Sequence, residues 1–446
     1  MFNVLANRVY RHLFLAQVIA LVGTGLATVA LGLLAYDIAR GSAGAVLGTA
    51  LAIKMVAYVV VAPVAGAFAA ILPRRAVLVT LDLVRAGVAV ALPFVTEVWQ
   101  VYVLIFLLQS ASAAFTPTFQ ATIPDILPDE KEYTKALSLS RLAYDLESLV
   151  SPALAALLLT MISFHSLFLG TVIGFLASAA LVVSVLLPSP VANERRGIYD
   201  RTTRGIRIYL ATPRLQGLLA ICLAVSAAGS MVIVNTVVIV QSSFGLDQSD
   251  TASALAAFGG GSMLAALVLP KLLERVADRS VMLAGTGLLI GGLVLTTGVA
   301  NFPALLVLWA VLGVGYSIAQ TPSGRLLRRS AHAEDRPALF AAHFALSHAA
   351  WLLTYPLAGW LGATLGLTAA ALALEVLALV GLVSAVLLWP EADLDELTHT
   401  HDDLLPDDPH WSEGHHHHRN RHSHGFVIDR LHREWPHSGR PFRESR

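Results

Sequence analysis

Residues 115–152 read FTPTFQATIPDILPDEKEYTKALSLSRLAYDLESLVSP, and the second half of the chain repeats the landmarks of this stretch. Thr116-Pro117 returns as Thr321-Pro322, 205 residues later, and Pro152 returns as Pro356, 204 residues later. Two more landmarks keep this offset, with Asp129-Glu130 matching Glu334-Asp335 and Arg75 matching Arg279. Because one offset, constant to within a residue, serves all of them, the sequence indicates two copies of one structural unit.

The composition places both copies in a membrane. Of the 446 residues, 56% are hydrophobic and only 13% are charged, and the mean hydropathy is +0.68. A soluble chain of this length would form about three domains of ordinary composition, so these values predict an integral membrane protein instead. Windows with the roughly 20 apolar residues that a spanning helix needs fall at 13–36, 46–72, 76–95, 99–119, 139–162, 166–187, 215–240, 252–272, 281–299, 303–322, 338–362 and 368–389.

These windows define the expected fold. They are apolar on every side, whereas the strands of a membrane barrel alternate apolar and polar residues. Because six helices separate the two copies, both copies have the same orientation in the membrane. We therefore expect an all-α membrane protein with twelve transmembrane helices in two parallel six-helix repeats. The expected parts are an N-terminal half (1–188), a cytoplasmic linker (189–214), a C-terminal half (215–390) and a tail (391–446).

The loops predict the orientation. If the N-terminus is cytoplasmic, the inside loops carry 19 Lys and Arg residues, whereas the outside loops carry Arg40 alone. This asymmetry follows the positive-inside rule, and it predicts a multi-pass protein with both termini in the cytoplasm. Arg8 and Arg11 precede a long apolar segment without a small-residue cleavage site, which predicts a retained first span and not a removed signal peptide.

The tail is polar and holds 11 of the 16 His residues of the chain. Its candidate metal ligands are imidazoles, at His399, His401, His410, His415, His416, His417, His418, His422 and His424. Neutral imidazole binds nickel, copper and zinc, and it is mostly neutral near cytoplasmic pH because its ordinary pKa is about 6.5. With few apolar residues and several Pro, the tail is predicted to be disordered without metal. A purification tag is the alternative, but 28 residues follow the His run.

Charged residues within the spans are candidates for the substrate or proton pathway, because a charge at the bilayer centre costs roughly 2.5–3.5 kcal/mol. Asp82 and Arg85 are three residues apart and Arg141 and Asp145 are four apart, so each helix can satisfy its own pair. Glu147 is then left over, and the five side chains sum to a charge of −1. A net-negative region suits a cation or a proton. The alternative is a structural network of salt bridges, which we favour for the two Arg residues.

Two His residues share the eleventh window. His343 and His348 are five residues apart, hence about 140° apart around the helix, so they cannot bind one ion together without a distortion. By the repeat offset, His348 corresponds to Tyr144 and is a candidate for the pathway, the alternative being a hydrogen-bonded packing residue. Lys54 on the second span is expected to pair with Asp37 at the outer end of the first.

The helix pattern, the basic linker and the turn Gly66-Ala-Phe-Ala-Ala-Ile-Leu-Pro-Arg74-Arg75 resemble the major facilitator superfamily. This turn has Ala70 and Ile71 where the family's signature has an acidic residue and an Arg, so only Gly66 and the Arg pair carry the likeness. Residues 115–152 resemble the branch that includes macrolide and siderophore exporters. The His-rich tail is similar, in composition and position, to that of the nickel-resistance exporters. The resemblance implies the superfamily fold and export as the function.

We therefore expect a proton-coupled exporter of nickel, with cobalt as a second candidate ion, in the inner (plasma) membrane of a bacterium. Asp145 or Glu147 would carry the proton. We expect no enzymatic activity, no tightly bound cofactor and no nucleic-acid partner. The one Gly-rich run, at 258–262, lacks the Lys and Ser/Thr spacing of a phosphate loop, so the energy for transport is expected to come from an ion gradient. Two alternatives stay open: an exporter of drugs or siderophores whose tail buffers metal, and a metal-sensing membrane receptor that moves no substrate.

Overall fold

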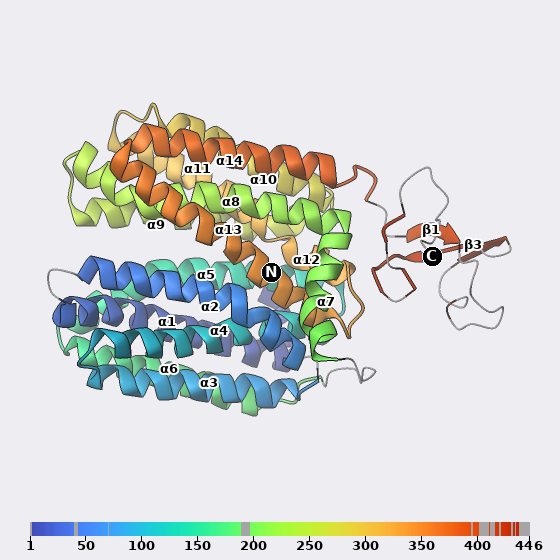
Figure 1. Cartoon of the computed structure of the whole chain (residues 1–446), viewed down its shortest axis with the longest axis horizontal. Coiled ribbons are helices and arrows are strands. Elements are labelled where there is room, and N and C mark those ends of the chain that lie inside the picture. Colours follow the sequence, from blue (N-terminus) through green and yellow to red (C-terminus); the bar gives the residue numbers. More distant parts are fainter. Residues whose placement is uncertain are drawn as a thin grey trace.

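The computed structural model describes residues 2–39, 43–69, 71–188, 197–393, 396–400, 410, 415–418, 421–429, 431–432 and 434–436. These residues form two bundles of helices, one from each half of the chain, that lie side by side (Figure 1). Helix α7 (Ile198–Ala211) lies at one end of the bundles, and the tail lies beyond that same end. We call this end the tail face.

The helices of the N-terminal half follow a short 3-10 helix at Phe2–Ala6. They are α1 (Arg8–Ala39), α2 (Ala43–Ala69), α3 (Arg74–Ala91), α4 (Val98–Ile126), α5 (Glu130–Leu159) and α6 (Phe164–Val183). The C-terminal half contains α8 (Pro213–Val237), α9 (Gln248–Leu272), α10 (Asp278–Thr296), α11 (Phe302–Gln320), α12 (Ser323–Arg329), α13 (Arg336–Thr364) and α14 (Leu367–Leu388). Side chains cap several starts, as Asp129 does by accepting a hydrogen bond from the Glu132 amide at 2.9 Å.

The element boundaries repeat with the offset of the sequence landmarks. Helix α3 begins at Arg74, and its counterpart α10 begins 204 residues later, at Asp278. The short helix α12 has no separate counterpart in the N-terminal half, because α11 and α12 together correspond to α4. Thr116-Pro117 lies inside α4, whereas Thr321-Pro322 separates α11 from α12. Proline removes one backbone donor and crowds the preceding turn, and the two copies accommodate it differently.

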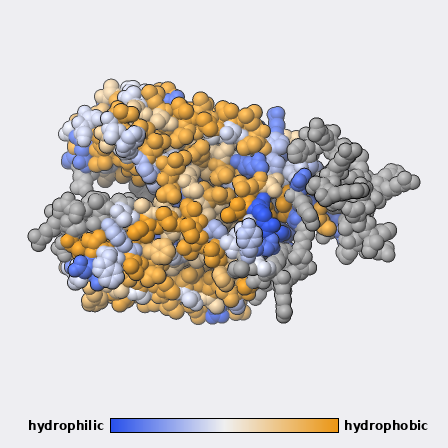
Figure 2. All heavy atoms as spheres, viewed as in Figure 1, coloured by the Kyte–Doolittle hydropathy of each residue, from blue (hydrophilic) through white to orange (hydrophobic). Residues whose placement is uncertain are grey.

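The surface of the bundles is that of a membrane protein. Ten helical spans of the described residues are long and apolar enough to cross a membrane. Helices α5 and α13 are not among them, although they are 30 and 29 residues long, and they are the two that carry Arg141, Asp145, Glu147 and His348. Figure 2 shows hydrophobic residues covering the middle of both bundles and hydrophilic residues gathering at their ends. The expected all-α membrane architecture of two six-helix repeats is confirmed.

The two halves approach each other through small side chains. Ala62 of α2 and Ala113 of α4 pack against Phe344 and Ala345 of α13. At Gly66 the helices are so close that an added Cβ would lie 2.5 Å from the Cβ of Ala341. Small residues permit such close approach between membrane helices.

The described residues of the tail include three short strands. Strands β1 (Glu396–Thr400), β2 (His415–His418) and β3 (Arg421–Gly425) form an antiparallel sheet in the order β1-β3-β2. After β3, Phe426 and Ile428 are buried in the hydrophobic core of the C-terminal half. The prediction considered only whether the tail could build a core of its own. These two residues instead use a core that the helices already provide.

Candidate functional site

At mid-depth, Arg141 and Asp145 connect the two halves. Both lie on α5, one turn apart, and they form the predicted ion pair, with 3.2 Å between Arg141 Nε and Asp145 Oδ2. The hydroxyl of Ser262, on α9, donates to Asp145 Oδ2 at 2.6 Å and accepts from Arg141 Nε at 3.1 Å. Gln320, at the end of α11, accepts from Arg141 Nη1 at 3.3 Å. An ion pair of one half is therefore bonded to two helices of the other.

The surroundings of this pair compensate for its burial. The side chain of Asp145 is only 4% exposed, and the guanidinium of Arg141 lies over the ring of Tyr316, 4.5 Å from its centroid. A buried ion pair is costly unless its remaining donors and acceptors are bonded. Here a carboxylate, a hydroxyl, an amide and an aromatic ring all contact the guanidinium. Ser262 lies in the Gly-rich run at 258–262, and the sequence pattern did not single it out.

Asp82 and Arg85 form the second predicted pair, on α3. The carboxylate is fully buried, and the guanidinium is 5% exposed. Ser178 of α6 donates to Asp82 Oδ2 at 2.8 Å, and the rings of Phe115 and Phe175 lie 4.1 and 4.5 Å from Arg85 Cζ. All these contacts join helices of the N-terminal half. The geometry therefore favours a structural role for this pair over a place in the pathway.

Glu147 lies on α5, about 3 Å further along the helix axis than Asp145. Helix α1 passes directly beside it, since a Cβ added to Gly25 would lie 3.0 Å from Glu147 Oε1. Lys54 of α2 acts electrostatically on this carboxylate. The expected partner of Lys54, the side chain of Asp37, lies outside the described residues. When Lys54 is added to the five charges of the sequence analysis, their sum rises from −1 to zero.

His348 completes a group around Lys54 that we call the central cluster: Lys54, Tyr58, Glu147 and His348. His348 Nδ1 lies 2.7 Å from the carbonyl oxygen of Phe344. A carbonyl only accepts, so Nδ1 carries the proton and Nε2 presents its lone pair. The ring of Tyr58 meets the ring of His348 edge-on, at 4.8 Å between centroids, and Lys54 Nζ lies 5.6 Å from the Tyr58 centroid. The central cluster thus joins α2 and α5 of one half to α13 of the other.

His343 points to different partners, as the predicted angle requires. Its Nδ1 lies 3.0 Å from the hydroxyl of Tyr209, on α7. Arg204, also on α7, binds Asp335 at the start of α13 through two hydrogen bonds of 2.7 Å. Burial alone would lower the pKa of Arg204, but Asp335 outweighs it and raises the pKa above its ordinary value. Helix α7 is therefore firmly attached to the C-terminal half.

At the tail face, an acidic residue holds two Arg residues from opposite halves. Asp125, at the end of α4, lies 2.5 Å from Arg74 Nη1 and 2.8 Å from Arg336 Nη1. Arg74 belongs to the turn whose signature acid is missing in this sequence, and it is 3% exposed. Asp125 supplies the carboxylate instead. From the sequence, Arg74 was noted as an inside charge and as part of the turn, Arg336 was only one of the inside charges, and Asp125 was not identified.

A second cluster at the tail face has the opposite charges. Arg325 of α12 lies 3.2 Å from Asp278 and 2.7 Å from Glu130 of the N-terminal half. It also donates to the hydroxyl of Thr134 at 3.0 Å, and Tyr133 donates to the carbonyl of Gly324 at 3.2 Å. Ion pairs and hydrogen bonds between the halves therefore close the tail face. At the opposite end, Figure 2 shows the surface hollowed between the bundles.

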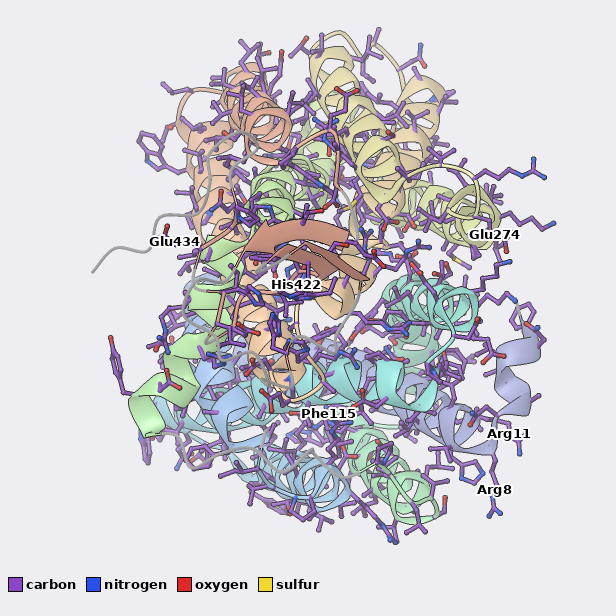
Figure 3. The ribbon with its side chains drawn as sticks, turned by 90° about the vertical axis from the view of Figure 1, so that its right-hand side faces the viewer. Arg8, Arg11, Phe115, Glu274, His422 and Glu434 are labelled. Atoms are coloured by element: carbon purple, nitrogen blue, oxygen red, sulfur yellow. The ribbon has the colours of Figure 1, made fainter. Side chains whose placement is uncertain are left out.

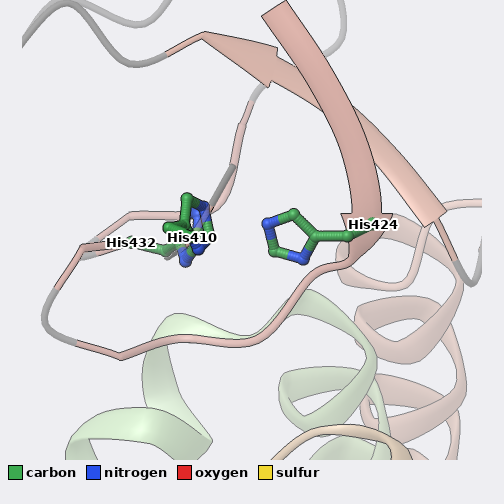
Figure 4. Close-up of side chains that lie close together, drawn as sticks. All are labelled: His410, His424 and His432. Atoms are coloured by element: carbon green, nitrogen blue, oxygen red, sulfur yellow. The ribbon is translucent and has the colours of Figure 1, made fainter. Parts of the chain in front are cut away.

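Three tail imidazoles meet in one place. His410, His424 and His432 are buried, and their potential ligand atoms all lie within 4.8 Å of one another (Figure 4). The Nε2 atoms of His422 and His410 are 3.0 Å apart. In the view onto the tail face, His422 lies near the centre, in front of the junction of the two halves (Figure 3).

The other predicted tail ligands are not placed by the structure. The backbones of His399 and His415–His418 lie in β1 and β2, but their side chains are outside the described residues, as is all of His401. His432 was not among our candidates, and no sequence signal distinguishes it from the other tail His residues. Asp429 lies beside it: burial would raise the pKa of this carboxyl, but His332 and His432 outweigh that effect and hold the pKa below its ordinary range.

Comparison with known proteins gives consistent matches. The chain matches the Major Facilitator Superfamily over residues 13–216 and again over 219–420. It is 23% identical over 343 residues to the uncharacterized MFS-type transporter YfiS of Bacillus subtilis, covering 73% of this chain and 81% of that protein. It is 25% identical over 177 residues to macrolide efflux protein A of Streptococcus pyogenes, covering 39% of this chain and 43% of that protein.

Two solved structures share the fold. The human organic anion transporter MFSD10 (TETRAN) aligns with a TM-score of 0.73 at 13% identity, covering 85% of this chain and 99% of that one. A bacterial homologue of the iron transporter ferroportin, in an outward-facing state, aligns with a TM-score of 0.72 at 14% identity, covering 85% and 98%. At these identities the likeness establishes the fold alone.

Proposed function

The chain belongs to the Major Facilitator Superfamily, and from that premise we propose that it exports a divalent metal ion, nickel or cobalt, from the cytoplasm in exchange for protons. Transporters built from such repeats bind their substrate near the bilayer midplane, between the repeats. The central cluster lies between the two halves, and Asp145 lies on α5 two positions before Glu147, on nearly the opposite side of the helix. These are the residues that we assign to the pathway.

The observation that carries the proposal is the chemistry of the central cluster. Two potential ligands interact electrostatically with Lys54 there: the carboxylate of Glu147 and the imidazole of His348, whose Nε2 presents its lone pair. Imidazole nitrogen suits nickel, copper and zinc, and carboxylate oxygen adds the negative charge that a cation site needs. A tail with 11 His residues adds many imidazoles beside the same pathway.

Lys54 gives the site a way to remain neutral without its ion. Because its ammonium acts on both Glu147 and His348, it balances the carboxylate when the site holds no cation. An arriving divalent ion competes with Lys54 for Glu147, and protonation of Glu147 removes the attraction for the ion. Proton entry from the outside would then favour release there, which is the order of events that export by proton exchange requires.

An exporter of organic compounds is the second candidate. The relatives include a macrolide efflux protein, and aromatic rings from both halves, Tyr58, Phe344 and Tyr316, lie at mid-depth. Sites for drug-sized ligands are lined mainly by apolar and aromatic side chains with a few polar groups. In this case the tail would buffer metal without supplying substrate. A metal-sensing receptor, the third candidate, would bind metal and move nothing.

Transport into inverted membrane vesicles tests these candidates. With an imposed pH gradient, acid inside, the proposal expects uptake of radioactive nickel that stops when the gradient is collapsed. Zinc, copper and a macrolide are tested in parallel. Gradient-driven uptake of the macrolide without nickel uptake would favour the second candidate, and metal binding without uptake of any compound would favour the receptor. Metal sensitivity of cells with and without the protein gives the same comparison in vivo.

A further inference from the structure

The tail imidazoles are not equivalent, because hydrogen bonds to oxygens that can only accept fix the tautomers of two of them. His432 Nδ1 lies 3.1 Å from Asp429 Oδ1, and a carboxylate accepts, so Nδ1 carries the proton. His424 Nδ1 lies 3.0 Å from the carbonyl oxygen of Gly425, which assigns its proton in the same way. In both rings Nε2 is therefore the nitrogen that carries the lone pair. A metal-binding His commonly donates its other N–H to a carboxylate or a backbone carbonyl, which fixes the ring and raises its basicity.

We propose that His410, His424 and His432 form one specific site for a divalent late first-row metal ion, and that Asp429 holds its ligand His432 in place. This inference rests on the proposed function in one respect: it takes nickel or cobalt as the ion that occupies the site in the cell. The site is one ordered arrangement within the tail, distinct from loose binding by the whole His-rich segment. It includes His432, which composition alone does not select.

The dimensions and ligands define the class of ion. Three nitrogens at bond lengths of 2.0–2.1 Å around a tetrahedral ion lie roughly 3.4 Å apart. The ligand atoms of the three imidazoles lie within 4.8 Å of one another, so an inward movement of about 1 Å closes the site. Three neutral imidazoles suit cobalt, nickel, copper or zinc and not magnesium or calcium, which prefer oxygen. A fourth position stays open for water or another ligand.

The site is attached to the transporter body. Phe426, one residue beyond the Gly425 carbonyl that orients His424, is 2% exposed and packs in the core of the C-terminal half. The ring of Trp435 lies 5.1 Å from the guanidinium of Arg214, at the start of α8. Asp429, which orients His432, also lies 3.6 Å from His332 Nε2, in the loop before α13. A metal ion at the site would thus stabilise the segment that joins the tail to the tail face.

A binding measurement on the full-length protein in detergent tests the inference, with cobalt as the probe because its visible absorption reports coordination. Titration of the unaltered protein should show one tight site before weaker ones fill. His432→Ala should remove the tight site, whereas His437→Ala, which removes a tail imidazole outside the set, should retain it. Asp429→Asn keeps all three ligands and should weaken the tight site by roughly 10–100-fold, the usual effect of losing such a carboxylate.

Equal losses in His432→Ala and His437→Ala, or unchanged affinity in Asp429→Asn, would overturn the site. Hydrogen exchange provides a second readout: cobalt should slow exchange at residues 421–432 in the unaltered protein and not in His432→Ala. Exchange that is equally slowed in both would also contradict the inference. Because neither measurement involves transport, failure of the proposed export and failure of this site can be distinguished.

Discussion

Asp145 and Glu147 lie two residues apart on α5, yet their surroundings are different. Asp145 is bonded to Arg141 and Ser262, so its charge is needed to hold the two halves together. Glu147 lies beside Gly25, and the cation that acts on it among the described residues is the ammonium of Lys54. Removal of the Asp145 charge would leave Arg141 without its carboxylate partner, whereas removal of the Glu147 charge leaves only a Lys on a flexible stem. Glu147 is therefore the cleaner test of proton coupling.

We expect Glu147→Gln to lose nearly all proton-driven transport while it still inserts and folds, because the amide keeps the shape of the side chain but cannot carry a proton. Vesicle uptake at matched protein levels measures this. Glu375→Gln is the matched control, since it removes a carboxylate from α14, within the membrane but outside the central cluster, and should transport normally. Full activity of Glu147→Gln would rule out this residue as the carrier.

A second prediction concerns stability. Asp82→Asn leaves the buried guanidinium of Arg85 without its carboxylate partner, and breaking a buried pair in this way costs about 3–5 kcal/mol. Thermal unfolding in detergent should therefore occur at a clearly lower temperature. The double variant Asp82→Leu with Arg85→Leu removes both charges and should recover most of the loss. If Asp82→Asn unfolded normally and lost only transport, the pair would belong to the pathway after all.

Residue spacing was sufficient to predict both intrahelical ion pairs, because partners three or four positions apart face each other on any helix. It could not reveal Ser262, Gln320 or Asp125, since these bonds form between helices whose relative position no local pattern encodes. Asp125 and Arg336 are 211 positions apart in the sequence. The predicted partner of Lys54 was likewise sought only on the neighbouring span, so its interactions with Glu147 and His348 were not predicted.

At the scale of elements, the tail face is closed by two clusters of inverted charge. In one, the acid Asp125 lies between Arg74 and Arg336; in the other, Arg325 lies between the acids Asp278 and Glu130. Arg74 and Asp278 occupy matching positions of the repeat, 204 residues apart, yet they have opposite charges. The duplication thus produced two equivalent positions in the two halves. Because these positions carry opposite charges, the surfaces that meet at the tail face attract and do not repel each other.

We expect Asp125→Asn to open the tail face, because the substitution removes the charge that holds Arg336 of α13 against Arg74 of α3. Spin labels at positions 131 and 274, one in each half at this face, should report a longer and broader distance distribution. Glu132→Gln changes an acid of the same region that neither Arg contacts, and it should leave the distances unchanged. An unaltered distribution in Asp125→Asn would show that packing alone closes the face.

The same measurement can separate packing from charge. Gly66→Ala places a Cβ 2.5 Å from the Cβ of Ala341, which is too close for two carbon atoms, so α2 and α13 must separate. We expect longer distances between the spin labels. Gly87→Ala provides the control, because a Cβ there meets no atom within 4 Å. If both variants gave the distances of the unaltered protein, the contact between α2 and α13 would not determine closure.

For the whole molecule, the architecture could be predicted from the duplication and from the apolar windows, because both signals extend over many residues. A local irregularity such as the break between α11 and α12 at Pro322 does not change them. The tail was harder to predict. Its composition is that of a disordered segment, but Phe426 and Ile428 pack on a surface formed by distant helices. A composition argument treats the tail as isolated and therefore cannot detect such docking.

Both termini are predicted to be cytoplasmic from the loop charges. In the structure, the N-terminus lies at the tail face, as shown by the 2.6 Å contact of His12 with Ser184, which directly follows α6. Cysteine labelling in a Cys222→Ala background should find position 440 inaccessible from outside intact cells and accessible after lysis. Labelling from the outside would contradict the orientation and, with it, access of the tail to cytoplasmic metal.

The last prediction separates the tail from the pathway. The structure indicates where to truncate: Asp393 accepts from the indole of Trp389 at 3.1 Å and pairs with Arg214 at 3.3 Å, so the deletion should begin at residue 394. We expect this deletion to weaken metal resistance without abolishing it, because a segment outside the membrane raises the local ion concentration but cannot replace a site between the halves.

The deletion also exposes the surface on which Phe426 and Ile428 pack. Protein levels and thermal unfolding must therefore be compared with a triple variant, His410→Ala, His424→Ala and His432→Ala, which keeps both apolar residues. Partial resistance in both proteins, at equal abundance, supports a tail that supplies ions to a separate pathway. Complete loss of transport in the triple variant, with normal folding, would mean that the tail site is an obligatory step, because only ligands and no docking residues have been removed.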